Sequence, residues 1–316
     1  MTLNGADVIV RVRGLVLATG DPDDPRILVH GVDLDVTAGE VVCVVGESGS
    51  GKSLTVLAIM GLLPPGVWIE EGTIEYAGRD LAALSERELR TLRGKDISMV
   101  FQDPLSSLNP LRRVGSQIAE SVRLHDRSLT RGAVRSRVKH LLESVGVRDA
   151  GRRARDFPNQ WSGGMRQRAM IAMAIAHDPA LIIADEPTTA LDVTVQAQVM
   201  RVLADVRRRT GSALILITHD LGLAAGVADN MTIMWKGRAV EQGTVFDIFD
   251  EPAHAYTRSL LASVLTPLSE RGHAVATGVS EHLAAQTSEP RPGRPWPMRR
   301  LSTTHIVADG VPGARS

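Results

Sequence analysis

The stretch of sequence that decides the fold is GESGSGKS, Gly46 to Ser53. It matches the pattern GxxxxGK[ST] in full and follows the apolar run Val41 to Val45, which predicts a strand buried on both faces. Leu54 to Leu63 continues as a predicted helix, which two prolines end. A strand, a glycine-rich loop and a helix in this order are the context in which the pattern binds phosphate groups.

The chemistry of this loop points to a nucleotide. Glycines let the backbone curl so that N–H groups turn inward, and the following helix presents the positive end of its dipole. We expect Lys52 to reach the β- and γ-phosphates of ATP and the Ser53 hydroxyl to bind Mg²⁺. A chance glycine-rich turn is the alternative, which the flanking elements disfavour. The predicted nucleotide contacts here are Gly46, Glu47, Ser48, Gly49, Ser50, Gly51, Lys52, Ser53 and Thr55.

Composition narrows the class of protein further. The chain has 316 residues, enough for one large α/β domain with a subdomain or for two modest domains. Its 36 basic and 36 acidic residues cancel, so no net field recruits nucleic acid or an anionic membrane. The single cysteine, Cys43, cannot form an internal disulfide, which favours a reducing cytosol. We expect no signal peptide, and since prolines interrupt the longest apolar stretch, no membrane-spanning helix.

The order of the predicted elements indicates an α/β fold with a mostly parallel central sheet. Two further buried strands, Leu181 to Ala184 and Ala213 to Ile217, flank the helical pattern Val193 to Arg208. Loosely alternating segments between Val8 and Val36 predict an antiparallel β subdomain at the edge of the fold. From about residue 103 to 178 apolar residues recur at helical spacing, which predicts an inserted helical subdomain.

Polar side chains follow the carboxyl ends of the predicted strands, where ligands bind in such sheets. Asp185 suits coordination of Mg²⁺, and Glu186 suits a general base that orients the attacking water. Gln102 is a candidate for contacts with both. A lone histidine is more often structural than functional, but the strand-end position of His219 favours a functional role. Two solvated carboxylates are the alternative for the acidic pair, which the phosphate loop disfavours.

The segment WSGGMRQR, Trp161 to Arg168, resembles the signature motif of ABC transporter ATPases. The resemblance covers roughly residues 8 to 265 and implies a P-loop NTPase fold of the ABC type. It implies Gly46 to Ser53 as the Walker A motif, Gln102 as the Q-loop, Asp185 as the Walker B aspartate, Glu186 as the catalytic glutamate, Ala190 to Asp192 as the D-loop and His219 as the switch histidine.

The signature also implies a dimer. Ser162, Gly163 and Gly164 would present a hydroxyl and backbone N–H groups at a helix N-terminus, a second phosphate site that cannot fold back onto the chain's own loop. In the ABC family this segment closes over ATP held by the partner ATPase, and Asp192 is counted with it among the nucleotide-binding residues. The resemblance therefore implies two ATP molecules sandwiched between two cassettes.

Three further sequence segments narrow the subfamily. FQDPLSSLNP (Phe101 to Pro110), ADEPTTALDVTVQAQV and EPAHAYTRSLL (Glu251 to Leu261) are very similar to segments of the peptide/nickel importers, and look closest to the first of their two paired ATPases. The resemblance implies an ATP-hydrolysing motor, peripheral on the cytoplasmic face of the membrane, that drives uptake of oligopeptides, dipeptides, nickel or metal-chelating opines. The implied partners are a paralogous second ATPase, two integral membrane permeases and an external substrate-binding protein, with no nucleic acid.

Two other functions compete with this one. A soluble ABC-type ATPase of DNA repair or translation is disfavoured by the neutral charge and the single cassette. An exporter subunit is disfavoured by the importer-like sequences of Asp103 to Pro110 and Glu251 to Leu261. The transported molecule touches the partners and not this chain, so the sequence does not choose between peptides and nickel.

The sequence departs from the family pattern at three points. Trp161 stands where the signature usually has Leu. No aromatic residue lies between Val16 and Val29 to stack on adenine, which leaves Arg26 or Ile27 for that contact. Residues 262–316 contain no cysteine, so we expect no iron–sulfur cluster.

These observations divide the chain into an ATPase domain, residues 1–266, and a tail, residues 267–316. The domain ends in a family-specific segment at about residues 251–266. The tail is rich in Pro, Gly, Ser and Arg, so we expect it to be flexible. We also expect deletion of residues 276–316 to leave ATPase activity unchanged.

Overall fold

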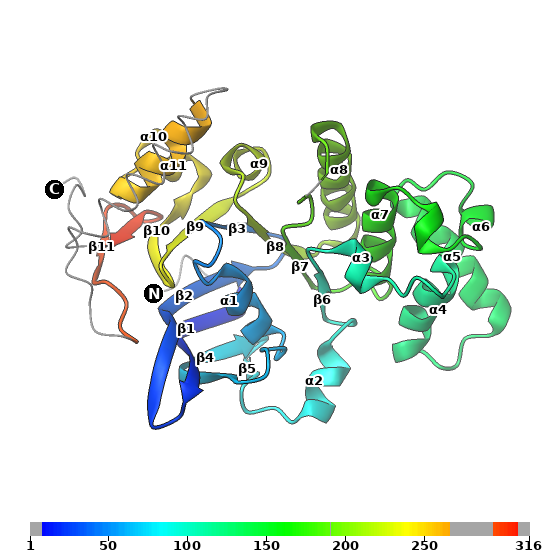
Figure 1. Cartoon of the computed structure of the whole chain (residues 1–316), viewed down its shortest axis with the longest axis horizontal. Helices are drawn as coiled ribbons and strands as arrows, with labels where there is room; N and C mark the ends of the chain where they lie inside the picture. Colours follow the sequence, from blue (N-terminus) through cyan, green and yellow to red (C-terminus); the bar gives the residue numbers. More distant parts are fainter. Residues whose placement is uncertain (1–7, 190, 266–292, 309–316) are drawn as a thin grey trace. The chain divides into compact units, whose positions relative to one another are not determined.

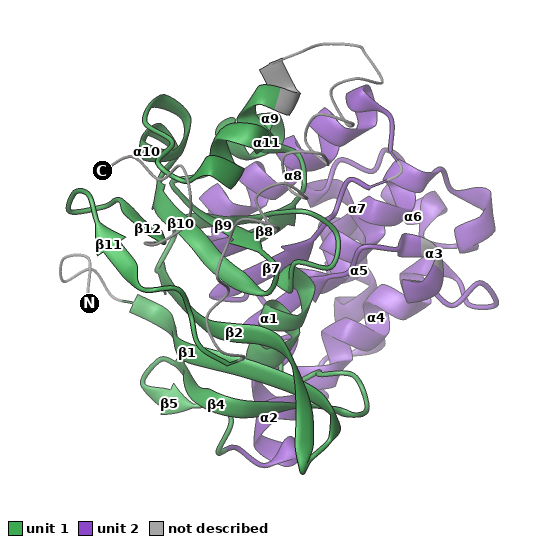
Figure 2. Ribbon diagram, turned by 60° about the vertical axis from the view of Figure 1, so that its left-hand side comes forward, with its two compact units in different colours: residues 1–83, 216–316 green, residues 84–215 purple. Residues whose placement is uncertain are grey.

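The computed structural model describes residues 8–189, 191–265 and 293–308. The chain divides into two compact units, which Figure 2 colours separately: unit 1 is residues 1–83 and 216–316, and unit 2 is residues 84–215. Unit 2 contains the whole region predicted as a helical subdomain, together with elements on both sides of it.

Unit 1 begins with an antiparallel sheet in the strand order β2-β1-β4-β5. Its strands are β1 Val8–Asp21, β2 Asp24–Thr37, β4 Val67–Tyr76 and β5 Arg79–Asp80. Alternate residues near the start of β1, Val10 and Val12, are fully buried, as expected for a strand with one face on a core. The predicted antiparallel β subdomain is confirmed.

The second sheet of unit 1 is mixed, with the strand order β11-β12-β10-β9-β3. Its strands are β3 Val41–Val45, β9 Asn230–Trp235, β10 Arg238–Thr244, β11 Met298–Arg300 and β12 Ile306–Ala308. β3 pairs with β9 in parallel, and the other pairs are antiparallel. All of β3 is buried, which its apolar run predicts. Strand β8, Ala213–Thr218, crosses the division between the units.

The helices of unit 1 follow its strands along the chain and are labelled in Figure 1. They are α1 Lys52–Ile59, α9 Leu221–Ala225, α10 Val245–Asp250 and α11 Ala255–Leu265. α1 directly follows the phosphate loop and ends four residues before the predicted end, so the two prolines lie beyond the helix.

The C-terminal part of unit 1 differs from the prediction of a flexible tail. Residues 293–308 carry β11 and β12, and β12 pairs with β10 at Glu241 and Gln242. Trp296 is 3% exposed and Val307 is fully buried. For residues 293–308 the prediction is wrong, because these apolar side chains find a core that composition does not reveal. The remainder of the predicted tail lies outside the described residues.

Unit 2 combines a parallel strand pair with a group of helices. β6 Ile97–Val100 pairs with β7 Leu181–Asp185. The helices are α2 Glu86–Leu92, α3 Pro104–Ser107, α4 Val114–His125, α5 Arg131–Ser144, α6 Ala150–Arg153, α7 Gly163–Ala174 and α8 Val193–Thr210. Helices α4, α5 and α7 pack against one another (Figure 1). Val114, Ile118 and Val122, four residues apart on α4, are buried, as the helical spacing predicts.

The helices of both units share one further property. Within the part of the chain that the structure describes, none combines the length and the apolar character that a bilayer crossing requires.

Candidate nucleotide-binding site

The phosphate loop in unit 1 joins a buried strand to a helix N-terminus, as predicted. β3 ends at Val45 and α1 begins at Lys52. At Gly46 an added Cβ would lie 2.1 Å from the carbonyl oxygen of Met234 on β9, so no side chain fits there. The glycine lets the loop start tight against β9.

Lys52 closes the loop from inside. Its side chain is 4% exposed, and its Nζ donates hydrogen bonds to the carbonyl oxygens of Gly46 at 2.8 Å and of Glu47 at 2.7 Å. These bonds keep an ammonium group at a curled backbone that leads into a helix N-terminus. Such an arrangement suits the phosphates of a nucleotide.

The other predicted loop contacts differ in exposure. Ser50 is 4% exposed, and its hydroxyl has no hydrogen-bond partner within the described residues. Thr55 is 1% exposed, and its hydroxyl donates to the Gly51 carbonyl oxygen at 3.0 Å, so its side chain serves the first turn of α1. The exposed or half-buried members of the set are Glu47, Ser48, Gly49 and Ser53.

Tyr256 on α11 also holds this loop, and sequence reasoning missed it. Its hydroxyl accepts a hydrogen bond from the backbone N–H of Glu47 at 3.1 Å, and its side chain is 1% exposed. A separation of 209 residues hides this contact from any local pattern. The only available signal is that Tyr256 falls in the segment EPAHAYTRSLL.

The two residues left for an adenine contact both lie on β2. Arg26 is exposed and Ile27 is half-buried, so either side chain is accessible to a ligand. The assignment of the adenine contact stays a prediction.

The catalytic candidates of unit 2 come together at the end of β7. Asp185 is the last residue of the strand and is 7% exposed. Glu186 follows with φ +43°, a left-handed conformation that costs about 1–3 kcal/mol and is often found at functional sites. Its Oε2 accepts hydrogen bonds from Gln102 Nε2 at 3.0 Å and from Thr189 Oγ1 at 2.8 Å. The structure therefore brings Gln102 and Glu186 together and orients the carboxylate with two donors.

The signature segment forms the N-terminus of α7. Ser162 is the exposed N-cap, and its hydroxyl accepts a hydrogen bond from the Met165 N–H at 3.4 Å. A Cβ at Gly164 would lie 2.4 Å from Cγ1 of Val195, so the glycine allows α7 to approach α8 closely. Trp161, the departure from the family pattern, is 2% exposed and belongs to the core. The exposed cap and helix N-terminus can receive an anion.

Asp192 and His219 occupy helix-start positions. The Asp192 side chain caps α8 by accepting from the Val195 N–H at 2.9 Å. His219 is exposed and lies between β8 and α9, and its neighbour Asp220 caps α9 through the Leu223 N–H at 3.0 Å. The contacts of Asp192 and His219 with a nucleotide stay predictions.

The predicted Mg²⁺ ligands are distributed over both units, Ser53 in unit 1 and Gln102 and Asp185 in unit 2. Among the residues described, no three His, Cys, Asp or Glu side chains gather into a group that could hold a metal. Mg²⁺ does not need one, since it commonly keeps several waters and binds one or two carboxylates together with substrate phosphates. The hydroxyl of Ser53, the amide of Gln102 and the carboxylate of Asp185 offer the oxygen ligands that this ion prefers.

A glycine loop closed by a buried lysine, between a strand and a helix, defines a P-loop nucleotide-binding cassette. Residues 29–189 match the model of the ABC transporter family. The chain belongs to that family, as one of its ATP-binding cassettes, and is an ATPase.

Several similar proteins confirm the resemblance to the ATPases of peptide importers. The chain is 48% identical over 238 residues to the dipeptide transport ATP-binding protein DppD of Lactococcus lactis, covering 75% of this chain and 68% of the relative. It is 49% identical over 239 residues to the oligopeptide transport ATP-binding protein OppD of Bacillus subtilis, covering 75% and 66%. It is 46% identical over 284 residues to DppD of Bacillus subtilis, covering 90% and 83%.

Solved structures confirm the predicted ABC-type fold. The ATP-binding cassette MJ0796, a dimer bound to ADP and phosphate, aligns with a TM-score of 0.67 at 26% identity, over 75% of this chain and 98% of that chain. The protein cbiO1 from Clostridium perfringens, part of the ABC transporter complex cbiONQ, aligns with a TM-score of 0.66 at 25% identity, over 85% and 98%.

Proposed function

We propose that this chain is the ATP-hydrolysing motor subunit of a membrane importer for oligopeptides or dipeptides. The relatives named for dipeptide and oligopeptide transport support the peptide cargo, and nickel or metal chelates are the competing substrates. The observation that carries the hydrolytic part is the Glu186 carboxylate, held at the end of β7 by Gln102 and Thr189. A carboxylate fixed in this way can orient a water molecule and accept its proton.

Different residues of the chain have different roles in hydrolysis. The N–H groups of Gly46 to Ser53 and the ammonium of Lys52 bind and orient the phosphates. Ser53, Asp185 and Gln102 would hold Mg²⁺, which supplies charge neutralisation at the phosphates. Glu186 accepts the proton of the water whose oxygen bonds to the γ-phosphorus, while the bond to the β,γ-bridging oxygen breaks and ADP leaves. His219 contacts the γ-phosphate in this proposal.

The working unit is a dimer of cassettes. The N-terminus of α7, with its exposed cap Ser162 and with Gly163 and Gly164, receives ATP that the partner cassette holds, and Asp192 lies at the same junction. The dimeric cassette structure supports this arrangement. Closure excludes water and completes each site, and hydrolysis reopens it. An isolated chain should therefore bind ATP and hydrolyse it poorly.

The remaining partners follow from the transporter family. The second cassette is a paralogue, two integral membrane permeases carry the substrate, and an external binding protein delivers it. The chain then sits peripherally on the cytoplasmic face of the membrane. Purification with two membrane proteins supports this assembly, whereas recovery on DNA or ribosomes at moderate salt contradicts it. Uptake assays on the whole transporter, comparing peptides with nickel and its chelates, identify the substrate.

Replacement of the catalytic carboxylate tests the hydrolytic role. In the assembled complex Glu186→Gln should retain ATP binding and lower turnover by about 10²- to 10⁴-fold, the usual contribution of a positioned base. The matched control is Glu143→Gln, because Glu143 is a half-exposed residue of α5 whose partner is Lys139 at 3.6 Å. Near-normal turnover in Glu186→Gln would show that another group accepts the proton.

A further inference from the structure

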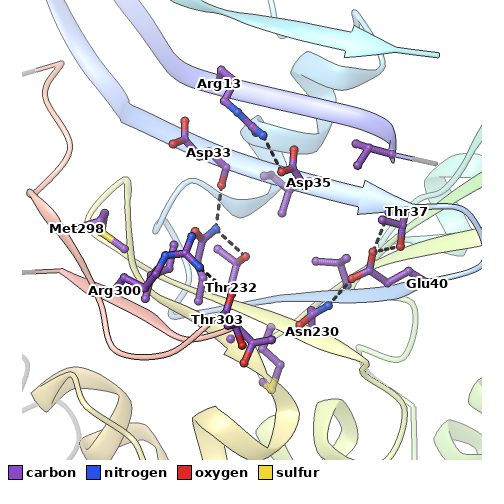
Figure 3. A pocket seen from close by; sticks show the side chains of 18 residues that line it. Arg13, Asp33, Asp35, Thr37, Glu40, Asn230, Thr232, Met298, Arg300 and Thr303 are labelled. Carbon is purple, nitrogen blue, oxygen red and sulfur yellow. Dashed lines mark hydrogen bonds and ion pairs between the residues drawn. The ribbon is translucent and has the colours of Figure 1, made fainter. Parts of the chain in front are cut away.

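The C-terminal segment of residues 293–308 has no role in the mechanism above, yet it is integrated into unit 1. β12 extends the mixed sheet beside β10, and β11 extends it further. The segment also closes one side of a cavity of about 290 Å³. In Figure 3, Met298, Arg300 and Thr303 of the segment line this cavity together with Asp33 and Asp35 of β2. The segment is thus a structural part of the nucleotide-binding unit.

Three aromatic rings form a continuous stack that starts in this segment. The Trp296 ring stacks on the Trp235 ring with centroids 5.8 Å apart and planes 10° apart. The Trp235 ring in turn stacks on the Tyr256 ring, at 5.5 Å and 23°. All three side chains are at most 3% exposed. The guanidinium of Arg238 lies 5.2 Å from the Trp296 ring, so a cation further fixes that end of the stack.

The other end of the stack meets the phosphate loop. The Tyr256 hydroxyl accepts the Glu47 N–H, while the Glu47 carbonyl accepts from Lys52, so both peptide groups of Glu47 are held. Burial raises the pKa of the Tyr256 hydroxyl, so the phenol keeps its proton at neutral pH. Once Lys52 turns to a bound phosphate, the Tyr256 hydroxyl continues to define where the loop begins.

Polar contacts fix the part of the segment just before Trp296. The Gly293 N–H donates to Nδ1 of His30 at 3.0 Å, and Nε of Arg238 donates to the Arg294 carbonyl oxygen at 3.1 Å. Added Cβ atoms at Gly31 would lie 2.6 Å from the Pro295 ring, which shows how closely the segment covers β2.

A buried carboxylate ties the far end of the segment to the start of α11. Nε2 of His305 lies 2.7 Å from Oε1 of Glu241, and the two side chains are 3% and 0% exposed. Glu241 also accepts the N–H groups of Ala253 at 2.7 Å and His254 at 3.0 Å. Ala253 and His254 immediately precede α11, so the segment and the helix that carries Tyr256 share one anchor.

We propose that residues 293–308 are a positioning element of the ATP site, which acts through Trp296, Trp235 and Tyr256 to hold Glu47 at the start of the phosphate loop. The inference rests on the ATP site of the proposed function. It reverses the expectation that residues 276–316 can be deleted without effect. Rigid packing of this kind lowers the cost of ordering a loop when a ligand binds.

The hydroxyl of Tyr256 is tested in the complete chain by Tyr256→Phe, which keeps the ring and removes the acceptor. Affinity for ATP and ADP should fall three- to tenfold, and affinity for AMP, which lacks the β- and γ-phosphates, should not change. Tyr76→Phe on β4 is the matched control and should bind ATP normally. Equal affinity of Tyr256→Phe and the parent chain would overturn the proposal.

The stack itself is tested by Trp296→Leu, which keeps apolar volume without a ring to stack. ATP affinity should fall by a similar factor, Trp296→Phe should restore it, and the double variant with Tyr256→Phe should bind no more weakly than Tyr256→Phe alone. Leu301→Ala, at a 40% exposed position of the same segment, is the control. A lower melting temperature with unchanged affinity, or additive losses, would show that the segment only stabilises the fold.

These measurements separate the two proposals. They report nucleotide binding and not turnover, so an active Glu186→Gln complex counts against the hydrolytic assignment alone. Unchanged ATP affinity in Tyr256→Phe counts against the positioning element alone. Loss of the exciton signal of stacked indoles from the circular dichroism spectrum of Trp296→Leu verifies that the variant disrupts the intended contact.

Discussion

The phosphate loop and the N-terminus of α7 are the two proposed anion sites, and both contain glycine at a helix start, but they are built differently. The loop has its own buried cation, Lys52, and is held from distant parts of unit 1 by Met234 and Tyr256. The start of α7 has no charged residue in its first three positions, and its cap, Ser162, is exposed. We therefore expect the phosphate loop, with its own charge and support, to bind ATP alone, and the exposed cap of α7 to bind only ATP that another subunit presents.

The cation is the difference with the largest expected effect. Lys52→Ala should lower the ATP affinity of the isolated chain by about 10²-fold, because hydrogen bonds between charged groups contribute about 1.5–3 kcal/mol each. Equilibrium binding of ATP measures this. Lys139→Ala, which removes an exposed lysine of α5, is the control and should have no effect. If Lys52→Ala bound ATP normally, the two anion sites would not differ in the way proposed.

Acid should lower the free energy of unfolding through His254, which accepts a hydrogen bond from the backbone of Tyr256. Burial, and then the charge of Arg258, lower the pKa of His254 from 6.5 to about 4, and the neutral ring accepts the Tyr256 N–H through Nδ1 at 3.1 Å. Between pH 6.5 and about 4 the unfolded chain binds a proton that the folded chain does not, so the free energy of unfolding falls as the pH falls. From pH 7 to pH 5 the expected loss is about 2 kcal/mol.

Urea unfolding at pH 7 and pH 5 measures this loss. The control is His254→Asn, whose amide oxygen can still accept the Tyr256 N–H but which does not titrate. Its stability should depend less on pH over the same range. An imidazole of His254 that titrates near pH 6.5 in an NMR experiment would contradict the assignment.

The two proposed anion sites also show what a sequence can predict. Gly46 to Ser53 and Ser162 to Gly164 are local patterns, since their residues act on the backbone within a few positions, and both lie where the patterns place them. The contact of Tyr256 with Glu47 joins positions 209 apart, so only the folded chain reveals it. The left-handed backbone of Glu186 is likewise imposed by its surroundings, and no residue type signals it.

The C-terminal segment shows why composition alone misleads. Residues 291–300 are rich in Pro and Arg and poor in apolar residues, which predicts flexibility. Such a prediction uses only the average composition of a window of residues. One well-placed side chain can outweigh that average. Trp296 stacks on Trp235, and backbone groups of Gly293 and Arg294 bond to His30 and Arg238, which the sequence places 263 and 56 residues away.

The packing of α7 on α8 offers the smallest and most selective test. In Gly164→Ala the new Cβ meets Cγ1 of Val195 at 2.4 Å, and such overpacking costs about 1–3 kcal/mol. Because the clash should displace the start of α7 from α8, ATPase activity of the assembled complex should fall about tenfold. Gly164→Ala combined with Val195→Ala should recover most of it, because the opposing methyl group is gone. ATP binding by the isolated chain should not change, since the phosphate loop lies in unit 1.

Gly151→Ala on α6 is the matched control for this variant, because nothing lies within 4 Å of the Cβ that it adds. Its complex should hydrolyse ATP at the normal rate. If Gly164→Ala lowered the ATP affinity of the isolated chain as much as it lowered turnover of the complex, then the start of α7 would serve its own chain's nucleotide. The contrast between a self-sufficient site and one that acts on a partner's ATP would then be lost.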